Sequence, residues 1–454
     1  MTRLHSGIIM TATMNRFSKI FSHLTREYGE PVKDPVWRNI SLSRGLLEVT
    51  ANKAFQKLNW IKQLGPTYLV YPGATHTRLN HSLGVFHLAR RMLIHLLTAD
   101  GTVTETAGRL PVVDLTLEGT RAFLCAALLH DLGHYPYAHS LKDVGLKSHE
   151  ALTAERILEH DLSRTIRERV GTDPELVAAI VDPSLSHAAG SELSFFRNLL
   201  SGVLDPDKLD YLNRDAYFCG VPHGTQDVDF VLAEIRPAAA GLSITEKGLS
   251  AVESILFSKY LMYKTVYWHK TVRIATAMIK KAILLALGQE VLRQEDLYWL
   301  DDYQFASLTD KHAFAPFALI RRVTDRRLYK MIAAVPFDPE NELHRHLQNV
   351  HTRLEFEEQL CRELAKLLGR AVPAESVIID IPEPINFEVH LPVICPETGE
   401  VTAYDQSRSV FDRDSVHSFV RSLRTVSLYG ELDNDLNEAM RKLEAGSILL
   451  RGLR

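Results

Sequence analysis

Residues 129–139 of the chain read Leu-His-Asp-Leu-Gly-His-Tyr-Pro-Tyr-Ala-His, directly after an apolar, helix-forming run at residues 123–128. Within this stretch, His130 and His134 lie four residues apart and so share one face of a helix. A glycine and a proline indicate that the helix loosens or stops here, which places His134 at the mouth of a pocket. Each histidine alone is more typical of a buried helix with satisfied side chains. The cluster of three histidines and one aspartate favours a site of metal chemistry.

The composition describes a globular chain without a dominant charge. Its 454 residues leave room for about two or three domains, and 46% of them are hydrophobic, enough for a sizeable core. The net charge of −4 comes from 52 basic and 56 acidic residues, so no overall field recruits nucleic acid or an anionic membrane. Ten of the twenty histidines lie between His76 and His187, which indicates metal or proton chemistry in the N-terminal half.

Cysteine usage and hydropathy predict a cytoplasmic protein. The four cysteines are far apart and form no Cys-x-x-Cys pair, which argues against a zinc knuckle or a disulfide framework. The apolar run at residues 7–10 is too short for a signal peptide, and no later run is long enough to span a bilayer. We therefore expect no membrane partner.

Several local structures are predicted before the central stretch. Residues 34–64 carry apolar side chains at roughly helical intervals. Residues 67–71 are β-branched or aromatic and precede Pro-Gly, which predicts a short strand or extended segment before a turn. A helix follows, and Arg78 and His81 would share one of its faces. Downstream, Ser148 is placed as the N-cap of a helical run that includes residues 152–162.

A second informative segment covers residues 202–215. Asp205 followed by proline is typical of a helix start. On this helix Asp207, Tyr211 and Asp215 recur every four residues and share a face, with Asp210 and Arg214 on the neighbouring stripe. Alternating acids and bases also suit a solvated helix face, and that alternative stays open.

We expect a mainly α fold, an all-helical core with a smaller C-terminal α/β domain. A long amphipathic helical stretch covers residues 251–287. Beyond residue 311 a helical run at 343–368 alternates with strand-like residues 376–381 and 387–393. The predicted organisation is an N-terminal segment at 1–36, a core at 37–310 and a C-terminal domain at 311–454.

A cation bound near residues 130 and 131 would draw on imidazole and carboxylate ligands together. Two histidines with two aspartates suit Mn, Fe, Ni or Zn, and Mg at weaker nitrogen ligation. Such an ion activates water and neutralises phosphate oxygens. Lys208 and Arg78 would add positive charge for a polyphosphate. The combined chemistry is hydrolysis of a phosphoester.

The ordered set His81, His130-Asp131 and Asp207 resembles the H…HD…D signature of the HD-domain phosphohydrolases. The flanking motifs are similar to the deoxynucleoside triphosphate triphosphohydrolase branch, which includes the SAM and HD domain protein. These motifs are Gln-Leu-Gly at 63–65, Tyr-Pro-Gly-Ala-Thr-His-Thr-Arg at 71–78, His-Ser-Leu-Gly-Val at 81–85, His-Asp-Leu-Gly-His at 130–134 and Asp-Lys-Leu-Asp-Tyr at 207–211.

The resemblance implies a role for each matching residue. One divalent metal ion would be held by His81, His130, Asp131 and Asp207, and an additional Mg²⁺ with the nucleotide is left open. His134 would act at the α-phosphate, with His139 and His149 near the phosphates and Glu150 supporting His134. Arg78 and Lys208 would bind the triphosphate, and Tyr211 would line the same pocket. Gln63 and Asp215 would bind the sugar 3′-hydroxyl, and Leu64 and Tyr267 would exclude a 2′-hydroxyl. The implied products are a deoxynucleoside and triphosphate.

Three departures limit this transfer. Lys142 stands where related enzymes often have an acidic residue, and Asp143 comes only after it. Lys259 stands where an arginine commonly contacts the phosphates, so a bidentate contact would be lost there. Trp268 replaces a polar residue found in some relatives, which leaves base selection open.

The resemblance also implies a homo-oligomer, a tetramer or hexamer, and an activating nucleotide. Two alternative functions remain. One is an HD-type nucleotidase or phosphodiesterase for another nucleotide. The other is a module that senses nucleotides or binds single-stranded nucleic acid, although nothing in the sequence supports nucleic acid as a partner.

Overall fold

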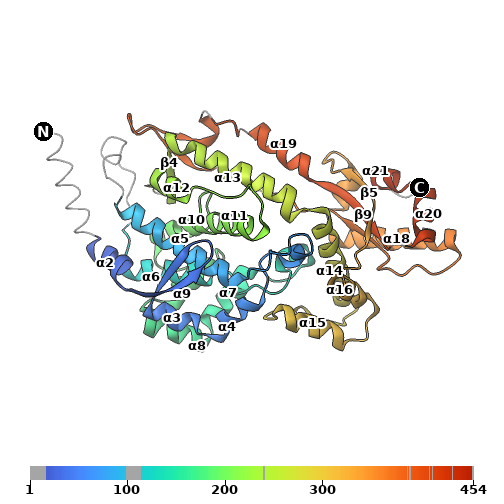
Figure 1. The fold of residues 1–454 in the computed structure, drawn as a ribbon, viewed down its shortest axis with the longest axis horizontal. Helices are drawn as coiled ribbons and strands as arrows, with labels where there is room; N and C mark the ends of the chain where they lie inside the picture. Colours follow the sequence, from blue (N-terminus) through green and yellow to red (C-terminus); the bar gives the residue numbers. More distant parts are fainter. Residues whose placement is uncertain are drawn as a thin grey trace.

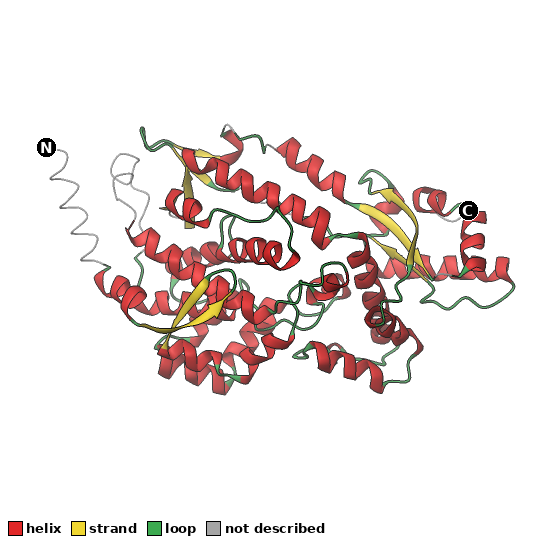
Figure 2. Ribbon diagram, in the orientation of Figure 1, coloured by secondary structure: helices red, strands yellow, loops and turns green. Residues whose placement is uncertain are grey.

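The computed structural model describes residues 17–98, 114–238, 241–385, 387, 390–407, 409–411, 413–431 and 433–451. Helices dominate these residues, and the described strands form three small sheets (Figure 2). The predicted mainly α fold with a smaller strand-containing C-terminal part is confirmed. The apolar run at residues 7–10 lies outside the described residues. Among the described helices, none combines the length and the apolar composition needed to cross a bilayer.

The helical core is built around α5 (Arg78–Thr98), which packs against α6 (Leu117–Leu129) and α11 (Pro206–Cys219) (Figure 1). Every residue of α6 from 122 to 129 is buried, because this run is apolar on all sides. The surrounding helices of the core are α2 (Ser18–Arg26), α3 (Arg44–Thr50), α4 (Lys53–Lys57), α7 (His149–Leu158), α8 (His160–Thr165), α9 (Pro174–Val181), α10 (Gly190–Leu200) and α12 (Val228–Glu234).

Two helix starts agree with the sequence prediction. Ser148 caps α7, its hydroxyl accepting from the Ala151 N–H at 3.1 Å. Asp205 caps α11, its carboxylate accepting from the Lys208 N–H at 2.6 Å. Such caps satisfy backbone donors that the first helical turn leaves free. The start of α11 therefore has a defined place, and with it Asp207.

The core also contains two hairpins, so the expectation of an all-helical core was wrong in this detail. The first pairs β1 (Tyr28–Asp34) with β2 (Arg38–Ser43), and the second pairs β3 (Ile235–Ala238) with β4 (Gly241–Thr245). β4 also pairs in parallel with β7 (Pro392–Ile394), which pairs with β8 (Val401–Ala403). This four-stranded sheet joins the predicted core to the C-terminal residues, while the predicted boundary at 310/311 stays a prediction.

The C-terminal residues form the third sheet, visible at the right of Figure 1. Its order is β5 (Lys330–Pro336), β9 (Thr425–Gly430) and β6 (Val377–Asp380), all antiparallel. It is reached through α13 (Leu249–Met262) and α14 (Lys270–Gly288). The remaining helices are α15 (Asp302–Lys311), α16 (Ala318–Thr324), α17 (Glu342–His346), α18 (Val350–Leu368), α19 (Arg413–Leu423), α20 (Asn434–Lys442) and α21 (Ala445–Arg451).

Four local predictions need correction. Residues 65–69 form a 3₁₀ helix with proline in its first turn, so the strand predicted at 67–71 was wrong. The stretch 251–287 is interrupted, since a π-helical turn over Tyr263–Tyr267 separates α13 from α14. Residues 34–64 contain β2 and short helices instead of one helical run. The side chains of Ser43 and Asn52 cap the N-termini of α3 and α4, so a new helix begins after each. In 387–393 the strand begins only at residue 392, and 388 and 389 lie outside the described residues.

Candidate metal centre

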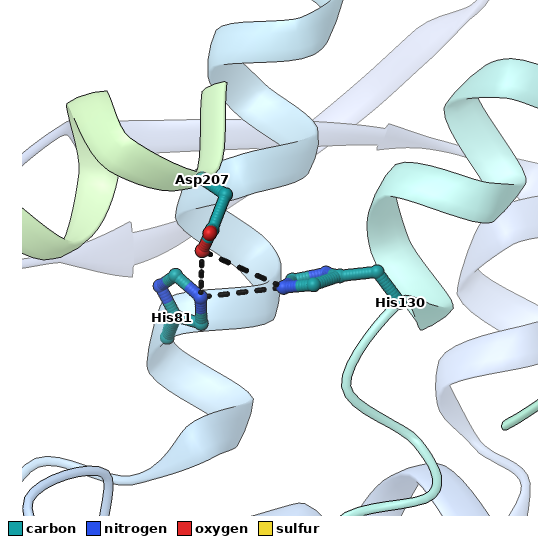
Figure 3. A group of neighbouring side chains, drawn as sticks. All are labelled: His81, His130 and Asp207. Carbon is teal, nitrogen blue, oxygen red and sulfur yellow. Dashed lines mark hydrogen bonds and ion pairs between the residues drawn. The ribbon is translucent and has the colours of Figure 1, made fainter. Parts of the chain in front are cut away.

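Three side chains from three helices converge at one point (Figure 3). His81 comes from α5, His130 follows the last residue of α6, and Asp207 lies in the first turn of α11. His81 Nε2 lies 2.9 Å from Asp207 Oδ1 and 3.3 Å from His130 Nε2, and His130 Nε2 lies 3.9 Å from the same carboxylate oxygen. The two histidines are 49 residues apart in the sequence, and the packing of α5 against α6 brings them together.

Asp131 borders this group on another side. Its Oδ1 lies 3.4 Å from His130 Nε2, and its Oδ2 lies 3.9 Å from His81 Nε2. Ligands held at about 2.1 Å from a tetrahedral ion are about 3.4 Å from one another. The separations among the His81, His130 and Asp207 atoms surround that value, so these three residues fit one divalent cation, and Asp131 borders the group through two different oxygens. Three of the four predicted ligands thus share one point, and Asp131 as the fourth ligand stays a prediction.

Hydrogen bonds on the outer ring nitrogens orient both histidines. His130 Nδ1 lies 3.0 Å from the Ala127 carbonyl oxygen, and His81 Nδ1 lies 2.8 Å from Asp210 Oδ2. Since a carbonyl or carboxylate oxygen accepts, each Nδ1–H donates outward. Each Nε2 is then directed toward the other ligands, the arrangement that metal-binding histidines need.

Asp210 is a buried support that the sequence interpretation missed. Besides His81, its carboxylate accepts from the Trp37 Nε1–H at 2.5 Å, and from Arg214 Nε at 2.8 Å and Nη2 at 2.9 Å. Both members of the Asp210–Arg214 pair are fully buried, so the alternative of a solvated helix face was wrong. Arg214 also donates to Asp34 at 2.8 Å, which ties the β1–β2 hairpin to the same network.

Gly84 provides the space for this network. A Cβ at position 84 would lie 1.8 Å from Asp210 Oδ1 and 2.5 Å from Arg214 Nη2. The glycine therefore lets α11 approach α5 closely enough for Asp210 to reach His81. The glycine was visible in the motif at residues 81–85, but the packing that requires it was not.

The histidines and carboxylates of this group attract one another strongly, which shifts their pKa values. Burial lowers the pKa of His81, but its hydrogen bonds to Asp207 and Asp210 outweigh this and raise the pKa to about 10. Burial raises the pKa of Asp207, yet the hydrogen bond from His81 brings it down to about 2. For Asp131, burial is outweighed by His134, His130 and Arg78, which hold its pKa well below the usual range. The carboxylates are therefore ionised at neutral pH.

A second cluster of histidines adjoins Asp131. His134 Nε2 lies 3.2 Å from His139 Nε2, and the rings of His134 and His149 are 3.9 Å apart. His134 Nδ1 lies 3.3 Å from Asp131 Oδ1, so Asp131, His134 and His149 also form a group with metal-ligand spacing. Asp131 thus lies between the two clusters.

Two predictions about this second cluster need correction. α6 ends at Leu129, and His134 follows it in a turn whose Gly133 N–H donates to the Thr153 hydroxyl at 2.7 Å. His134 is therefore fully buried and not at the mouth of a pocket. Glu150 pairs with His149, at 3.3 Å between Oε2 and Nδ1, instead of with His134.

Burial keeps these imidazoles neutral. It lowers the pKa of His134 and of His139 well below the usual range, and the Arg78 guanidinium adds to the effect. Burial likewise lowers the pKa of His149 to about 4, against the attraction of Glu150. A neutral imidazole can both accept and donate a proton, so the cluster has the form of a general acid–base group.

The predicted phosphate-binding cations have partners within the protein. Arg78 Nη1 donates to Asp131 Oδ2 at 2.7 Å, at the first turn of α5. Lys208 Nζ donates to Asp205 Oδ2 and to the Gly202 carbonyl, both at 2.7 Å. Lys259 is buried, with its ammonium 5.1 Å from the centre of the Phe387 ring. Arg78 therefore lies at the candidate metal centre. Lys208 is held at the first turn of α11, and Lys259 lies against Phe387 of the C-terminal segment.

Of the residues predicted to lie around the sugar, Asp215 and Tyr267 are in direct contact. Asp215 is buried and accepts from the Tyr267 hydroxyl at 2.6 Å, and Tyr267 lies edge-on to Tyr211 at 6.4 Å between ring centres. Gln63 has a buried side-chain oxygen without a hydrogen-bond partner among the described residues. Leu64 is partly buried against the core just before the 3₁₀ helix.

One further residue supports the histidine cluster and was missed. Lys57 donates from Nζ to the His134 carbonyl at 3.1 Å, and burial, with Arg156, lowers its pKa to about 7. Asp143, the acid near the departure at Lys142, forms ion pairs with Arg353 and Lys280. It is directed toward α14 and α18, so it does not replace the missing acid. No periodicity in the sequence reveals these long-range contacts.

Comparison with known proteins agrees with this geometry. Residues 78–190 match the family model described as HD domain, and residues 227–410 match the one described as HD associated region. The first match begins at Arg78 and contains His81 and the His130-Asp131 pair. The helical fold and this match identify an HD domain, and the chain belongs to the HD-domain phosphohydrolase superfamily.

Similar proteins extend the comparison. The uncharacterized protein YwfO of Bacillus subtilis is 31% identical over 336 residues, 68% of this chain and 73% of that protein. The deoxynucleoside triphosphate triphosphohydrolase SAMHD1 of Gallus gallus is 27% identical over 68% of this chain and 57% of its own length. A crystal structure of a hypothetical protein from Aquifex aeolicus superposes with a TM-score of 0.67 at 25% identity, covering 91% of this chain and 100% of that one.

Proposed function

We propose that this HD-domain phosphohydrolase hydrolyses deoxynucleoside triphosphates to a deoxynucleoside and triphosphate, by attack of water at the α-phosphate. The observation that carries the proposal is the position of Asp131, whose Oδ1 lies 3.4 Å from His130 Nε2 in the first group and 3.3 Å from His134 Nδ1 in the neutral histidine cluster. A cation in the first group would supply Lewis acidity and lower the pKa of bound water. The second group would supply a proton carrier a few ångström away.

Different residues would have different roles in the proposed reaction. His134 is buried and neutral, and its Nε2 faces His139, so it would hold or transfer a proton at the phosphate. His149 lies against its ring. Arg78 is already within hydrogen-bond distance of Asp131, so its guanidinium would stabilise negative charge on a phosphate at the same place.

The other end of the nucleotide would be recognised by the tyrosine and aspartate pair. The side chain of Asp215 is fixed by Tyr267, and its remaining lone pairs would accept from a sugar hydroxyl. The bulk of Tyr267 and Leu64 would leave no room for a 2′-hydroxyl, which makes a deoxyribose the expected sugar. Lys208 and Lys259 would extend the positive field along the phosphate chain.

The test is product analysis with a matched control. The purified protein is loaded with Mn²⁺, incubated with each dNTP alone and in mixtures, and the products are separated by ion-exchange chromatography. We expect triphosphate, and we expect Asp207→Ala to abolish its release. Asp229→Ala, which removes an exposed carboxylate paired with Arg91 on the core surface, should behave as wild type. Release of only monophosphate or orthophosphate would show that the proposed function is wrong.

A further inference from the structure

His76 is a buried histidine to which neither the sequence nor the comparisons assign a role. It lies in the segment between the 3₁₀ helix and α5, and its side chain is fully buried. Its Nε2 lies 2.8 Å from Asp215 Oδ1 on α11, although 139 residues separate the two along the chain. The ring stacks on Phe218, with 4.6 Å between ring centres. The stacking fixes the plane of the imidazole and so the direction of its N–H.

The carboxylate of Asp215 is therefore held at both oxygens. His76 donates to Oδ1 from one side, and the hydroxyl of Tyr267 donates to Oδ2 at 2.6 Å from the other. Burial raises the pKa of Tyr267 well above its ordinary value, and the charge of Asp215 adds to this, so the hydroxyl keeps its proton. An ionised carboxylate has about four lone-pair positions, of which these two donors use two. The remaining positions have a fixed direction.

His76 also connects Asp215 to Gln63 through the main chain. The Gln63 N–H donates to the His76 carbonyl at 3.0 Å. The side-chain oxygen of Gln63 is buried and has no hydrogen-bond partner among the described residues, and the same is true of His76 Nδ1. Buried polar atoms without partners are uncommon in folded proteins, and a bound polar ligand is one reason for them. The two residues proposed to bind the sugar are thus joined by His76.

We propose that His76 is a positioning residue that makes the site selective for a sugar with a free 3′-hydroxyl. This inference rests on the proposed function. With Asp215 oriented by His76 and Tyr267, a 3′-hydroxyl meets an acceptor whose direction is already set. A sugar without that hydroxyl leaves the buried Gln63 oxygen and the remaining lone pairs of Asp215 without a partner, and such sites reject the analogue that lacks the group. His76 itself touches no reacting atom.

The experiment compares a deoxynucleoside triphosphate with its 2′,3′-dideoxy analogue of the same base. Initial rates of triphosphate release give kcat and KM for wild type, His76→Phe and His76→Gln. Phenylalanine keeps the stack on Phe218 but cannot donate, whereas the glutamine amide can donate from nearly the position of Nε2. Thermal unfolding of each variant checks that it is folded.

We expect wild type to favour the 3′-hydroxyl substrate. His76→Phe should lower kcat/KM for that substrate roughly tenfold or more, the effect of one hydrogen bond to a charged group. It should change kcat/KM for the dideoxy analogue by less than about threefold, so the selectivity ratio collapses. His76→Gln should restore most of the ratio, and this variant carries the test if phenylalanine prevents folding. Tyr267→Phe should reduce the ratio as well, and less than additively with His76→Phe.

Three results would overturn the proposal. An equal loss on both substrates in His76→Phe would assign His76 a structural role. An unchanged ratio in both variants would remove it from the site. Equal kcat/KM of wild type on both substrates would show that the 3′-hydroxyl is not recognised, while the proposed hydrolysis stands. Absence of triphosphate release from any dNTP would instead refute the proposed function and this inference together.

Discussion

Asp210 Oδ2 lies 2.8 Å from His81 Nδ1, and both residues are completely buried between α5 and α11. The bond sets which nitrogen of His81 faces Asp207 and His130. Arg214 and Trp37 donate to the Asp210 carboxylate, and Asp34 accepts from Arg214, so the candidate metal centre depends on the first hairpin and on the middle of α11. The candidate ligands are therefore oriented by buried residues that do not themselves contact the metal position.

The first prediction concerns Asp210, which orients His81. Asp210→Asn removes the charge that orients His81 while Arg214 keeps its bond to Asp34. We expect metal affinity to fall by about 10- to 100-fold, as for other partners of metal-bound histidines. Metal content after dialysis against buffered Mn²⁺ measures it. Asp229→Asn on the surface serves as the control, and an unchanged metal affinity in Asp210→Asn would contradict the role given to Asp210.

The second prediction separates the two histidine groups. His134→Ala should abolish turnover, by at least about 100-fold, because it removes the proposed proton carrier. The metal should stay bound, since His81, His130, Asp131 and Asp207 remain. Elemental analysis of the purified variant beside its activity decides this. Loss of the ion would make His134 a ligand, a result compatible with its 3.3 Å distance from Asp131.

The third prediction concerns Asp143, which links the segment after His139 to α14 and α18. Arg353 is nearly buried and donates to Asp143 at 2.9 Å, and Lys280 pairs with the same carboxylate. Asp143→Ala leaves two neighbouring cations without this partner, and we expect a loss of stability on the order of 2 kcal/mol. Amide hydrogen exchange should become faster at residues 138–144. Asp325→Ala, at an exposed pair with Arg327, is the control. Unchanged exchange would show that the link does not order this segment.

The fourth prediction is a pH dependence of stability at His87. Burial, with Arg91 and Arg90, lowers the pKa of His87 to about 4, whereas an unfolded histidine titrates near 6.5. The folded state thus disfavours the proton, so this contribution to stability is complete above pH 6.5 and is lost as the pH falls from 6.5 toward 4.

His87→Phe removes that titration and keeps a ring against Trp37, which stacks on His87 at 6.1 Å. Between pH 7 and pH 5 the free energy of unfolding of wild type should fall by about 2 kcal/mol more than that of the variant. Urea unfolding at both pH values measures the difference. Parallel changes in the two proteins would rule out His87 as the source.

Local sequence patterns predicted much of the fold and the outline of the site. Capping at Ser148 and Asp205, the helix before His130 and the strand over 377–380 depend on neighbouring residues, and all are confirmed. The motif order gives His81, His130 and Asp207 as members of one family pattern, and the HD domain match contains the first two of these residues. The catalytic and substrate-binding assignments stay predictions.

The sequence by itself determined the residue types of the metal centre and where most of its helices begin, because spacing and capping act over a few residues. Only the tertiary structure decided that His134 is buried, that Glu150 pairs with His149 and that α11 is buried on the stripe of Asp210 and Arg214. Arg214 meets Asp34 across 180 residues. Such contacts form only when helices pack, and packing depends on the shape of the whole core and not on any one period in the chain.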